Sequence, residues 1–547
     1  MGSTSLTTPS GTESELRSTS RPRSDASPRR AMNARLWPAF VFSSSALALA
    51  AGGGVSLCRP CHSAIVESWR RTGMGRSILA PAALPGGSYY HRLSNRHYAV
   101  AGGVVHRHQL DAAGRRINVI EKRVDLVIGS GNHAMTPVHR TPQDRLIEMP
   151  LSWYAEEKAW AMSPGYDRPD HLDFRRPVTA ECLFCHAAYP AAEDPSPRPI
   201  DCARCHGAVE AHLNKPARGT ILNPARLPAA RQLDICLQCH LETASRAFPD
   251  SLRKPGRGVY SFRPGEALTA YKAYFDRDPP AERFEINHAG YRLLQSACFL
   301  SSAGRMTCTT CHDPHAARAR NACRGCHTSL AADHAGGAPD CAPCHMPARR
   351  TEDAIHVRMT DHKIMRRPAW KEPEREDHTP YLGALRIFAG WGDPASLGQA
   401  RFLHQARITG APEDWRKAPP TLANRAAFGD ALMRSGSHEA GRKVLQDVLR
   451  SDAGNVAALN GLAVFEGIRG RPAAALRLLE QARAADPDHP LTWINLGVAY
   501  EALGNHRQAL ASYDEAVRLQ PDSAQARRRR QALLDRGLAP ASAPPLP

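Results

Sequence analysis

The sequence predicts a mainly α-helical chain in three parts: an irregular cofactor-binding domain, a small β-rich insertion and a C-terminal α-helical solenoid. Two observations carry most of this prediction. The pattern Cys-x-x-Cys-His occurs seven times between residues 58 and 345, and a 34-residue repeat occupies the cysteine-free end of the chain. Short alternating apolar runs between the first two motifs predict the insertion.

Each Cys-x-x-Cys-His copy has the chemistry of a c-type haem attachment site, because two closely spaced thiols can bond to one porphyrin and the next residue can ligate the iron. The chain has 15 cysteines, and the motifs leave only Cys298 unused. The cysteines expected to attach haem are Cys58, Cys61, Cys182, Cys185, Cys202, Cys205, Cys236, Cys239, Cys308, Cys311, Cys323, Cys326, Cys341 and Cys344. The expected proximal ligands are His62, His186, His206, His240, His312, His327 and His345. We therefore expect seven covalent haem c groups.

Two other interpretations of the cysteines fit less well. Zinc ribbons combine cysteine pairs into four-ligand sites and do not need a His directly after the second Cys. A disulfide framework belongs to small secreted domains and gives no reason for the recurring His. Cys298 is expected to be a buried thiol, with an iron ligand or a reactive thiol as the alternative.

Histidines outside the motifs are candidates for the second axial position of each iron. The candidate distal ligands are His91, His133, His212, His288, His315, His334, His356 and His362, with His97 and His139 as further candidates from the insertion. His315 follows His312 too closely to reach the opposite face of the same haem, so we expect it to ligate a neighbour. Met74, Met306 and Met346 could also ligate, but we expect them in the core.

The charge balance is basic, with 71 Lys and Arg against 53 Asp and Glu. Such a balance can indicate nucleic acid or an anionic membrane as a partner. Haem propionates would offset most of the excess, however, and the chain has no interleaved aromatic and basic pattern typical of nucleic-acid binding. The sequence therefore predicts no nucleic-acid partner.

The first residues have the features of a targeting segment. Residues 1–31 are rich in Ser, Thr, Pro and Arg, and we expect them to be disordered or to lie upstream of the true start. Residues 32–51 form an expected signal peptide, with Arg35 before an apolar run and small residues up to Ala50. This predicts a periplasmic or otherwise exported protein. An uncleaved segment that anchors the chain to the membrane is the alternative.

The cysteine-containing part divides into two domains. Residues 52–176 are expected to hold the first haem site and the β-rich insertion, and residues 177–367 are expected to form a haem-dense domain. The second domain has little apolar patterning of its own, so we expect the porphyrins to supply its core. Residues 368–420 are rich in Pro and charge and are predicted to be a linker.

The 34-residue period predicts tetratricopeptide repeats over 421–537. Small residues and Pro recur at that spacing, as Leu459, Gly470, Ala475, Ala482 and Pro487 and again as Trp493, Gly504, Ala509, Ala516 and Pro521. Three repeats and a capping helix are expected, followed by a disordered tail over 538–547. Such a solenoid has a concave surface suited to a protein partner. A plain helical bundle is the alternative.

Together these motifs resemble the exported multihaem cytochromes that carry a C-terminal tetratricopeptide domain, a group related in haem packing to the tetrahaem cytochromes of ammonia oxidisers and to hydroxylamine oxidoreductase. The strings that carry the resemblance are IGSGNHA, IDCARCHGAVEAHL, LNPARL followed by CLQCHLE, FRPGE, SACFLSSAGRMTCTTCHDPH, DCAPCHMP and IHVRMTDHKIMR. The resemblance implies a mainly α fold, with an irregular multihaem cytochrome domain, a small β-rich insertion and a C-terminal α-helical TPR solenoid. It also implies His ligation on both faces of most haems. No Cys-x-x-Cys-Lys occurs, which counts against cytochrome c nitrite reductase.

Two functions remain open at this point. The first is electron transfer between redox partner proteins, one of which docks on the repeats. The second is an oxidoreductase that binds a small nitrogen or sulfur compound at a haem with an open axial position. The number of candidate distal histidines favours the electron carrier. The first haem is the expected exception, because its motif stands alone.

Overall fold

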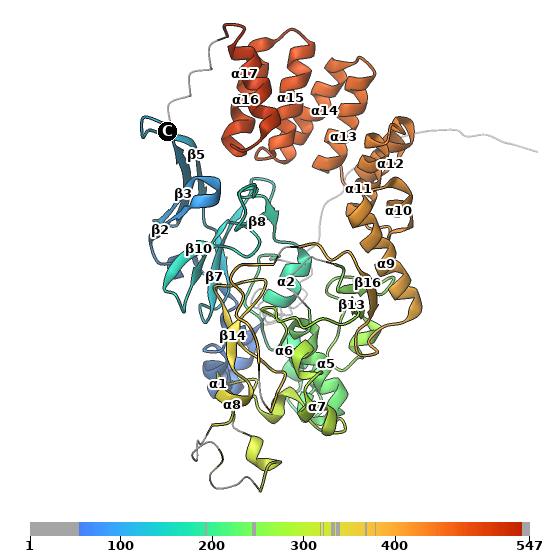
Figure 1. The fold of residues 1–547 in the computed structure, drawn as a ribbon. Coiled ribbons are helices and arrows are strands. Elements are labelled where there is room, and N and C mark those ends of the chain that lie inside the picture. Colours follow the sequence, from blue (N-terminus) through green and yellow to red (C-terminus); the bar gives the residue numbers. More distant parts are fainter. Residues whose placement is uncertain are drawn as a thin grey trace, which may run out of the picture. The chain divides into compact units, whose positions relative to one another are not determined.

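The computed structural model describes residues 54–538 apart from 192–193, 243–247, 318, 321, 330–333, 335–339, 367–368 and 378 (Figure 1). The predicted N-terminal extension, the signal peptide and nearly all of the predicted tail lie outside the described residues. In the described part of the chain, no helix combines the length and the apolar character that a membrane span requires.

The β-rich part is larger than the small insertion that the sequence predicted. A four-stranded antiparallel sheet has the order β2-β3-β4-β5, with strands Gly87–His91, Arg96–Ala101, Val104–Leu110 and Arg116–Arg123. A seven-stranded sheet contains β1 (Ile78–Leu79), β6 (Leu126–Ile128), β7 (Ala134–Arg140), β8 (Leu146–Glu148), β9 (Leu151–Tyr154), β10 (Ala159–Met162) and β11 (Arg176–Pro177). The described chain is therefore a mixed α and β protein.

Alternation of side chains explains why these segments form sheets. In β3, Tyr98 and Val100 are buried while His97 and Ala99 are partly exposed, which is the period of two expected of a half-buried strand. The buried face packs on residues of the second sheet, including Val127, Met135 and Leu151. Several of these strands are only two to four residues long, and such short runs are hard to identify from sequence.

The first motif lies in helix α1 (Val55–Trp69), and most of the other motifs end short helices. Helices α2 (Ala180–His186), α3 (Ala203–His206), α5 (Ala229–His240) and α8 (Ala342–His345) each end at the motif His. The other helices of this part are α4 (Glu210–Asn214), α6 (Ala289–Leu293) and α7 (Ala297–Ser301). The fifth and sixth motifs begin in single turns of 3₁₀-helix, Cys308–Thr310 and Cys323–Gly325.

This part has more apolar core than the sequence predicted. Phe184, Leu237, Phe262 and Tyr271 belong to one buried cluster beside the motifs. Strands β12 (Ser251–Arg253), β13 (Lys272–Asp278) and β16 (Ala384–Ile387) form a three-stranded sheet, and β14 (Ala348–Arg350) pairs with β15 (Arg358–Thr360). The aromatic residues of this cluster lie far apart in the sequence, and no period marks them as one core.

The predicted linker over 368–420 is largely folded. It contains β16, α9 (Pro394–Thr409) and α10 (Pro412–Lys417). Strand β16 pairs with β13, and the Asp393 side chain caps α9 by accepting a hydrogen bond from the Ser396 amide. The Pro and charge content that suggested a linker thus comes partly from helix N-termini, where Pro occupies the first turn.

The C-terminal helices form three pairs and a final single helix. They are α11 (Leu422–Arg434), α12 (His438–Ser451), α13 (Val456–Ile468), α14 (Pro472–Ala485), α15 (Pro490–Ala502), α16 (His506–Leu519) and α17 (Ala524–Leu534). Small residues allow the helices of a pair to approach closely. At Gly497 in α15, an added Cβ would lie 2.3 Å from the Tyr513 ring of α16.

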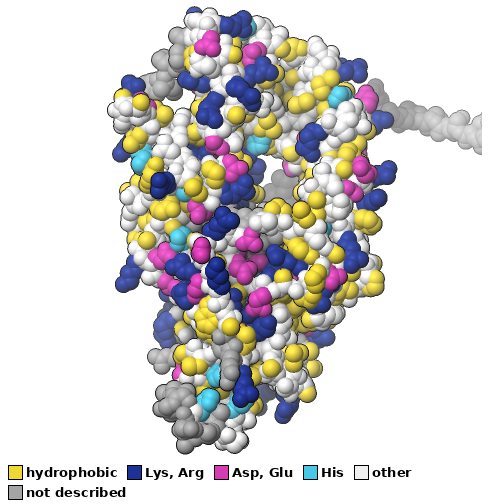
Figure 2. All heavy atoms as spheres, in the orientation of Figure 1, with side chains coloured by type: hydrophobic (Ala, Val, Ile, Leu, Met, Phe, Trp, Pro, Cys, Tyr) yellow, Lys and Arg dark blue, Asp and Glu magenta, His cyan; other side chains and the backbone are white. Residues whose placement is uncertain are grey.

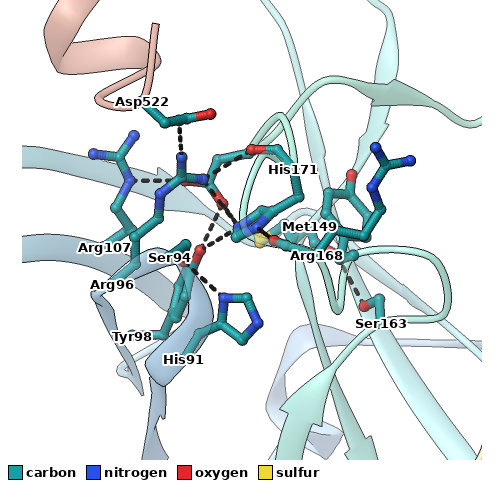
Figure 3. Close-up of polar contacts among 12 residues, drawn as sticks. His91, Ser94, Arg96, Tyr98, Arg107, Met149, Ser163, Arg168, His171 and Asp522 are labelled. Carbon is teal, nitrogen blue, oxygen red and sulfur yellow. Dashed lines mark hydrogen bonds and ion pairs between the residues drawn. The ribbon is translucent and has the colours of Figure 1, made fainter. Parts of the chain in front are cut away.

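A buried polar cluster joins the four-stranded sheet to the last helix pair (Figure 3). The fully buried Asp173 carboxylate accepts from Arg96 Nη1 at 2.8 Å and from Arg107 Nε at 2.9 Å. Arg96 also pairs with Asp522 at 2.6 Å, just after α16, and Arg107 Nη2 donates to the Leu519 carbonyl at 3.1 Å. The repeat region is thus held to the β-rich part by side chains whose charges are satisfied.

Candidate functional site

One large cavity collects most of the Cys-x-x-Cys-His motifs. Its volume is about 3050 Å³, and residues of the first five motifs line it, together with Cys323 of the sixth and Ala342 of the seventh. An ordinary ligand pocket has a volume of about 300–1,000 Å³. Because protein interiors are otherwise closely packed, the size of this cavity suits several large cofactors better than one small molecule.

Thiols from different motifs lie side by side. Four pairs are within hydrogen-bonding distance: Cys58 with Cys202, Cys185 with Cys239, Cys236 with Cys308 and Cys323 with Cys341. Each pair joins two motifs, so these motifs are neighbours in space. All the cysteines are free thiols in the structure.

Four motif histidines face a histidine from outside the motifs. The ring centroids are 6.3 Å apart for His62 and His212, 6.0 Å for His206 and His315, 6.0 Å for His312 and His362, and 6.1 Å for His334 and His345. The angles between the ring planes lie between 8° and 25°. His315 thus faces the third motif and not the His312 of its own motif.

These separations match two imidazoles bound to opposite sides of one metal ion. A bond between a metal ion and an imidazole nitrogen is about 2 Å long. With the ring radius added on each side, the two centroids lie about 6 Å apart. Aromatic side chains in ordinary contact also span about 4.5–7 Å between centroids, so the distance alone does not decide the matter. The four pairs share one further feature: each joins one motif His to one His outside the motifs.

Histidine pairs in the β-rich part provide a contrast. The rings of His97 and His108, directly opposite each other on β3 and β4, have centroids 5.1 Å apart. His91 and His171 are also 5.1 Å apart, at an angle of 71°. These pairs contain no motif residue and their rings are closer, as expected for direct side-chain packing.

The donor set suits haem better than a bare ion. Among the described residues, no group of three or more His, Cys, Asp and Glu side chains is arranged to hold a metal ion. A porphyrin supplies four ligands itself, so haem iron needs only two from the protein. Burial lowers the pKa of several of these imidazoles and so favours the neutral form that binds metals; they are His186, His240, His312, His315 and His362.

The other candidate distal ligands lie elsewhere. His133 lines the cavity, with Nδ1 3.6 Å from Glu156. His91 and His356 do not line it; their rings contact Asp167 at 3.1 Å and Glu157 at 2.8 Å. His288 is completely buried, stacks on Tyr291 at 4.5 Å and also does not line it. The structure therefore brings four of the eight candidates opposite a motif His.

Three motif histidines, His186, His240 and His327, have no facing histidine ring within the part of the chain that the structure describes. His327 and the neighbouring Cys326 are exposed. In Figure 2, several histidine side chains gather at the lower end, where α8 lies in Figure 1. Met74, Met306 and Met346 line the cavity, and Cys298 is partly buried close to Cys311.

Residues between the motif cysteines contribute contacts that the sequence analysis missed. Phe184, Arg204 and Gln238 each directly precede the second cysteine of a motif, in the second, third and fourth copies. The Arg204 guanidinium lies 4.3 Å from the Phe184 ring centroid, and Gln238 Nε2 donates to the Arg204 carbonyl at 3.3 Å. The charged Arg204 between two motif cysteines was the available signal in the sequence.

Comparisons with known proteins bear on the C-terminal helices. No curated protein matches the sequence, but a family model for the tetratricopeptide repeat matches residues 455–522. Similar solved structures include the type III secretion translocator chaperone SycD of Yersinia enterocolitica, at 16% identity and TM-score 0.21, with 22% of this chain and 98% of that one covered. The first TPR of Spaghetti (RPAP3), bound to an HSP90 peptide, has 15% identity, TM-score 0.21 and coverages of 22% and 94%. A crystal structure of MamA has 18% identity, TM-score 0.23 and coverages of 26% and 80%.

TM-scores this low carry no argument about the rest of the chain. The family model covers helices α13 to α16, in which Trp493, Gly497 and Tyr513 occupy the positions expected of the repeat. Residues 455–522 are therefore a segment of tetratricopeptide repeats.

Proposed function

We propose that the chain is a multihaem c-type cytochrome that transfers electrons outside the cytoplasm, with seven haems attached at the Cys-x-x-Cys-His motifs. The observation that carries this proposal is the set of four histidine pairs, each joining a motif His to a His outside the motifs at 6.0–6.3 Å. The large cavity lined by motif cysteines supports it.

The four histidine pairs suit electron transfer more than catalysis. Haem iron between two histidines changes its charge by one electron without exchanging a ligand. His62, His206, His312 and His345 would hold the iron on one side, and their partners would close the other side to small molecules. Thiol pairs such as Cys185 and Cys239 place neighbouring motifs in contact, as a path for electrons requires.

The ends of the chain supply the rest of the proposal. Residues 32–51 have the pattern of a signal peptide, and covalent haem attachment belongs to exported proteins, so we place the protein in the periplasm or another exported location. The tetratricopeptide segment is a protein-interaction module, and we assign it the docking of a redox partner.

An oxidoreductase is the second candidate function. It is favoured by His186, His240 and His327, which have no facing histidine among the described residues. A haem at one of these positions could offer an open axial site to a small nitrogen or sulfur compound. The first haem no longer stands out as the exception, because His212 faces His62.

The test is the mass and spectrum of the exported, full-length protein. We expect seven haem masses on the polypeptide and a low-spin spectrum for at least the four paired irons. His212→Ala should turn one haem high-spin, whereas His438→Ala, in α12 and away from the motifs, should leave the spectrum unchanged. A polypeptide that carries zinc and no haem would overturn the proposal. Rapid nitric oxide binding by the wild type would favour the oxidoreductase.

A further inference from the structure

Three histidines lie together on the outer face of the four-stranded sheet. His97 is on β3, and His106 and His108 are two residues apart on β4. Side chains alternate along a strand, and Tyr98 and Arg107 point to the buried face, where they join the polar cluster of Figure 3. The three histidines therefore share the opposite face, and all three are partly exposed.

The strand register brings the three positions close to one another. His97 is directly opposite His108, and Ala99 is directly opposite His106. Opposite side chains in an antiparallel pair have Cβ atoms about 5 Å apart, and diagonal neighbours are about 7–8 Å apart. The four positions thus form a rectangle on the sheet, with histidine at three corners. The small side chain of Ala99 at the fourth corner does not fill the space between the rings.

A carboxylate orients one of these rings. His106 Nδ1 lies 3.0 Å from Glu121 Oε1, and the two residues are directly opposite each other on β4 and β5. Because an ionised carboxylate can only accept, the neutral imidazole carries its hydrogen on Nδ1, and Nε2 keeps its lone pair for a metal ion. Histidines that ligate metals commonly donate their other ring N–H to a carboxylate in this way.

The other two rings contact each other in the structure. His97 stacks on both Tyr90 and His108, with ring centroids 4.4 and 5.1 Å away. Burial, together with the positive charge of Arg116, lowers the pKa of His108, which favours the neutral form that ligates metals. Among the described residues no three such groups already converge on one point, so binding requires the rings of His97 and His108 to turn about their side-chain bonds.

We propose that His97, His106 and His108 form a zinc site on the outer face of the sheet, with Glu121 as the residue that positions His106. Imidazole is a preferred ligand of Zn²⁺, and three protein ligands leave the fourth tetrahedral position open to water or to another donor. None of the four residues lines the cavity. The site therefore needs no haem and goes beyond the proposed electron transfer.

The experiment uses the full-length, exported protein and Zn²⁺ alone as the probe. Calorimetry measures the affinity and the number of zinc ions bound, and hydrogen exchange resolved by peptide locates them. The variants are His97→Gln, His106→Gln and His108→Gln, with His438→Ala in α12 as the control histidine. Peptides over 96–110 are followed separately from those that contain the motifs, so zinc bound by cysteines gives a different pattern.

The wild type should bind one zinc ion that slows hydrogen exchange in β3 and β4. The slowing should reach about a hundredfold when free zinc is at a hundred times its dissociation constant. Each of the three Gln variants should lower the affinity by more than about tenfold, since an outer partner of a ligand alone is worth about 10–100-fold. His438→Ala should leave the affinity unchanged.

Glu121 has its own readout. Glu121→Ala should lower the zinc affinity by about tenfold or more, because the His106 ring loses the acceptor that orients it. Glu121→Gln keeps an acceptor oxygen and should recover part of the affinity. Equal zinc affinity in the wild type and in Glu121→Ala would refute the positioning role.

The inference is overturned if zinc slows exchange only around the motif cysteines, or nowhere. It is also overturned if the Gln variants bind zinc as tightly as the wild type, or if His438→Ala weakens binding as much as they do. An affinity that falls in His97→Gln and His108→Gln but not in His106→Gln would refute the three-ligand arrangement. If His97→Gln does not fold, because it loses both ring contacts, the two variants on β4 decide by the same readouts, and unchanged affinity in both overturns the inference.

Discussion

The tetratricopeptide helices and the motif-bearing part of this chain obtain their cores in different ways. In the repeats, helices of 11–14 residues pack on one another, and their buried faces form continuous apolar clusters. In the motif-bearing part, α3 and α8 have only four residues, and residues of the motifs line a cavity of about 3050 Å³. Isolated helices shorter than about 12 residues are marginal in water. The difference teaches that the repeats fill their interior with their own side chains, whereas the motif-bearing part leaves a large volume that the proposed haems would fill.

The largest expected effect tests this difference directly. If the motifs attach haem as proposed, replacing Cys202 and Cys205 together by Ala should remove one haem. Residues 177–367 should then lose several kcal/mol of protection from hydrogen exchange, since a group that binds only the folded state contributes folding free energy. Helices α13 to α16 should keep their protection from hydrogen exchange. Hydrogen exchange resolved by peptide measures the protection of both regions. Cys298→Ala, outside the motifs, is the control, and equal loss in both regions would contradict the comparison.

The contact between the β-rich part and the repeats should give the next largest effect. Asp173→Asn leaves Arg96 and Arg107 buried beside a neutral amide and should cost about 3–5 kcal/mol of unfolding free energy. Asp522→Asn removes a partly exposed partner of the same cluster and should cost at most about 1 kcal/mol. Denaturant titration followed by circular dichroism measures both, and similar costs for the two variants would count against the buried network.

The same aspartate predicts a loss of stability in acid. Burial acts to raise the pKa of Asp173, but Arg107, His171 and Arg96 hold it below its ordinary value. A carboxyl with a lowered pKa in the folded state stabilises the protein above the unfolded pKa of about 4, and this contribution disappears as the pH falls below that value. The Asp173→Asn variant should lack this dependence of the unfolding free energy on pH, as measured by denaturant titrations at several pH values.

Within the repeats, Gly497→Ala should have an intermediate effect. Its Cβ would overlap the Tyr513 ring, and overpacking of this kind costs about 1–3 kcal/mol. Gly467→Ala is the matched control, because nothing lies within 4 Å of its Cβ and alanine is a better helix former by up to about 1 kcal/mol. The temperature at which the repeats unfold should therefore shift down in Gly497→Ala and slightly up in Gly467→Ala.

The smallest predicted effect concerns His139 in β7. Burial, followed by the charge of Lys122, lowers the pKa of His139 to about 4. The unfolded chain therefore binds a proton more readily, and stability should fall as the pH drops below about 6.5, by about 1 kcal/mol at pH 6. His139→Gln should remove this dependence and His106→Gln should keep it, as measured by denaturant titrations at pH 8 and pH 6.

Local patterns in the sequence predicted some features well. The 34-residue period identified the repeats because a regular period determines how neighbouring helices pack. The spacing of His312 and His315 predicted that His315 faces another motif, and in the structure it faces His206. Both predictions used constraints that act over a few residues.

Features that depend on distant contacts were not predictable. His91 and His356 are equivalent to His212 in the sequence, but Asp167 and Glu157 hold their rings outside the cavity. Residues 368–420 were predicted to be a linker because nothing local shows that β16 pairs with β13, more than a hundred residues away.

The four pairs of neighbouring thiols make the order of assembly important. In an oxidising compartment, two free thiols at such a distance readily form a disulfide. If the motifs attach haem as proposed, a bridge between Cys185 and Cys239, for example, would remove one attachment point from each of two motifs at once. The proposed function therefore requires that these thiols stay reduced until each has bonded to its haem.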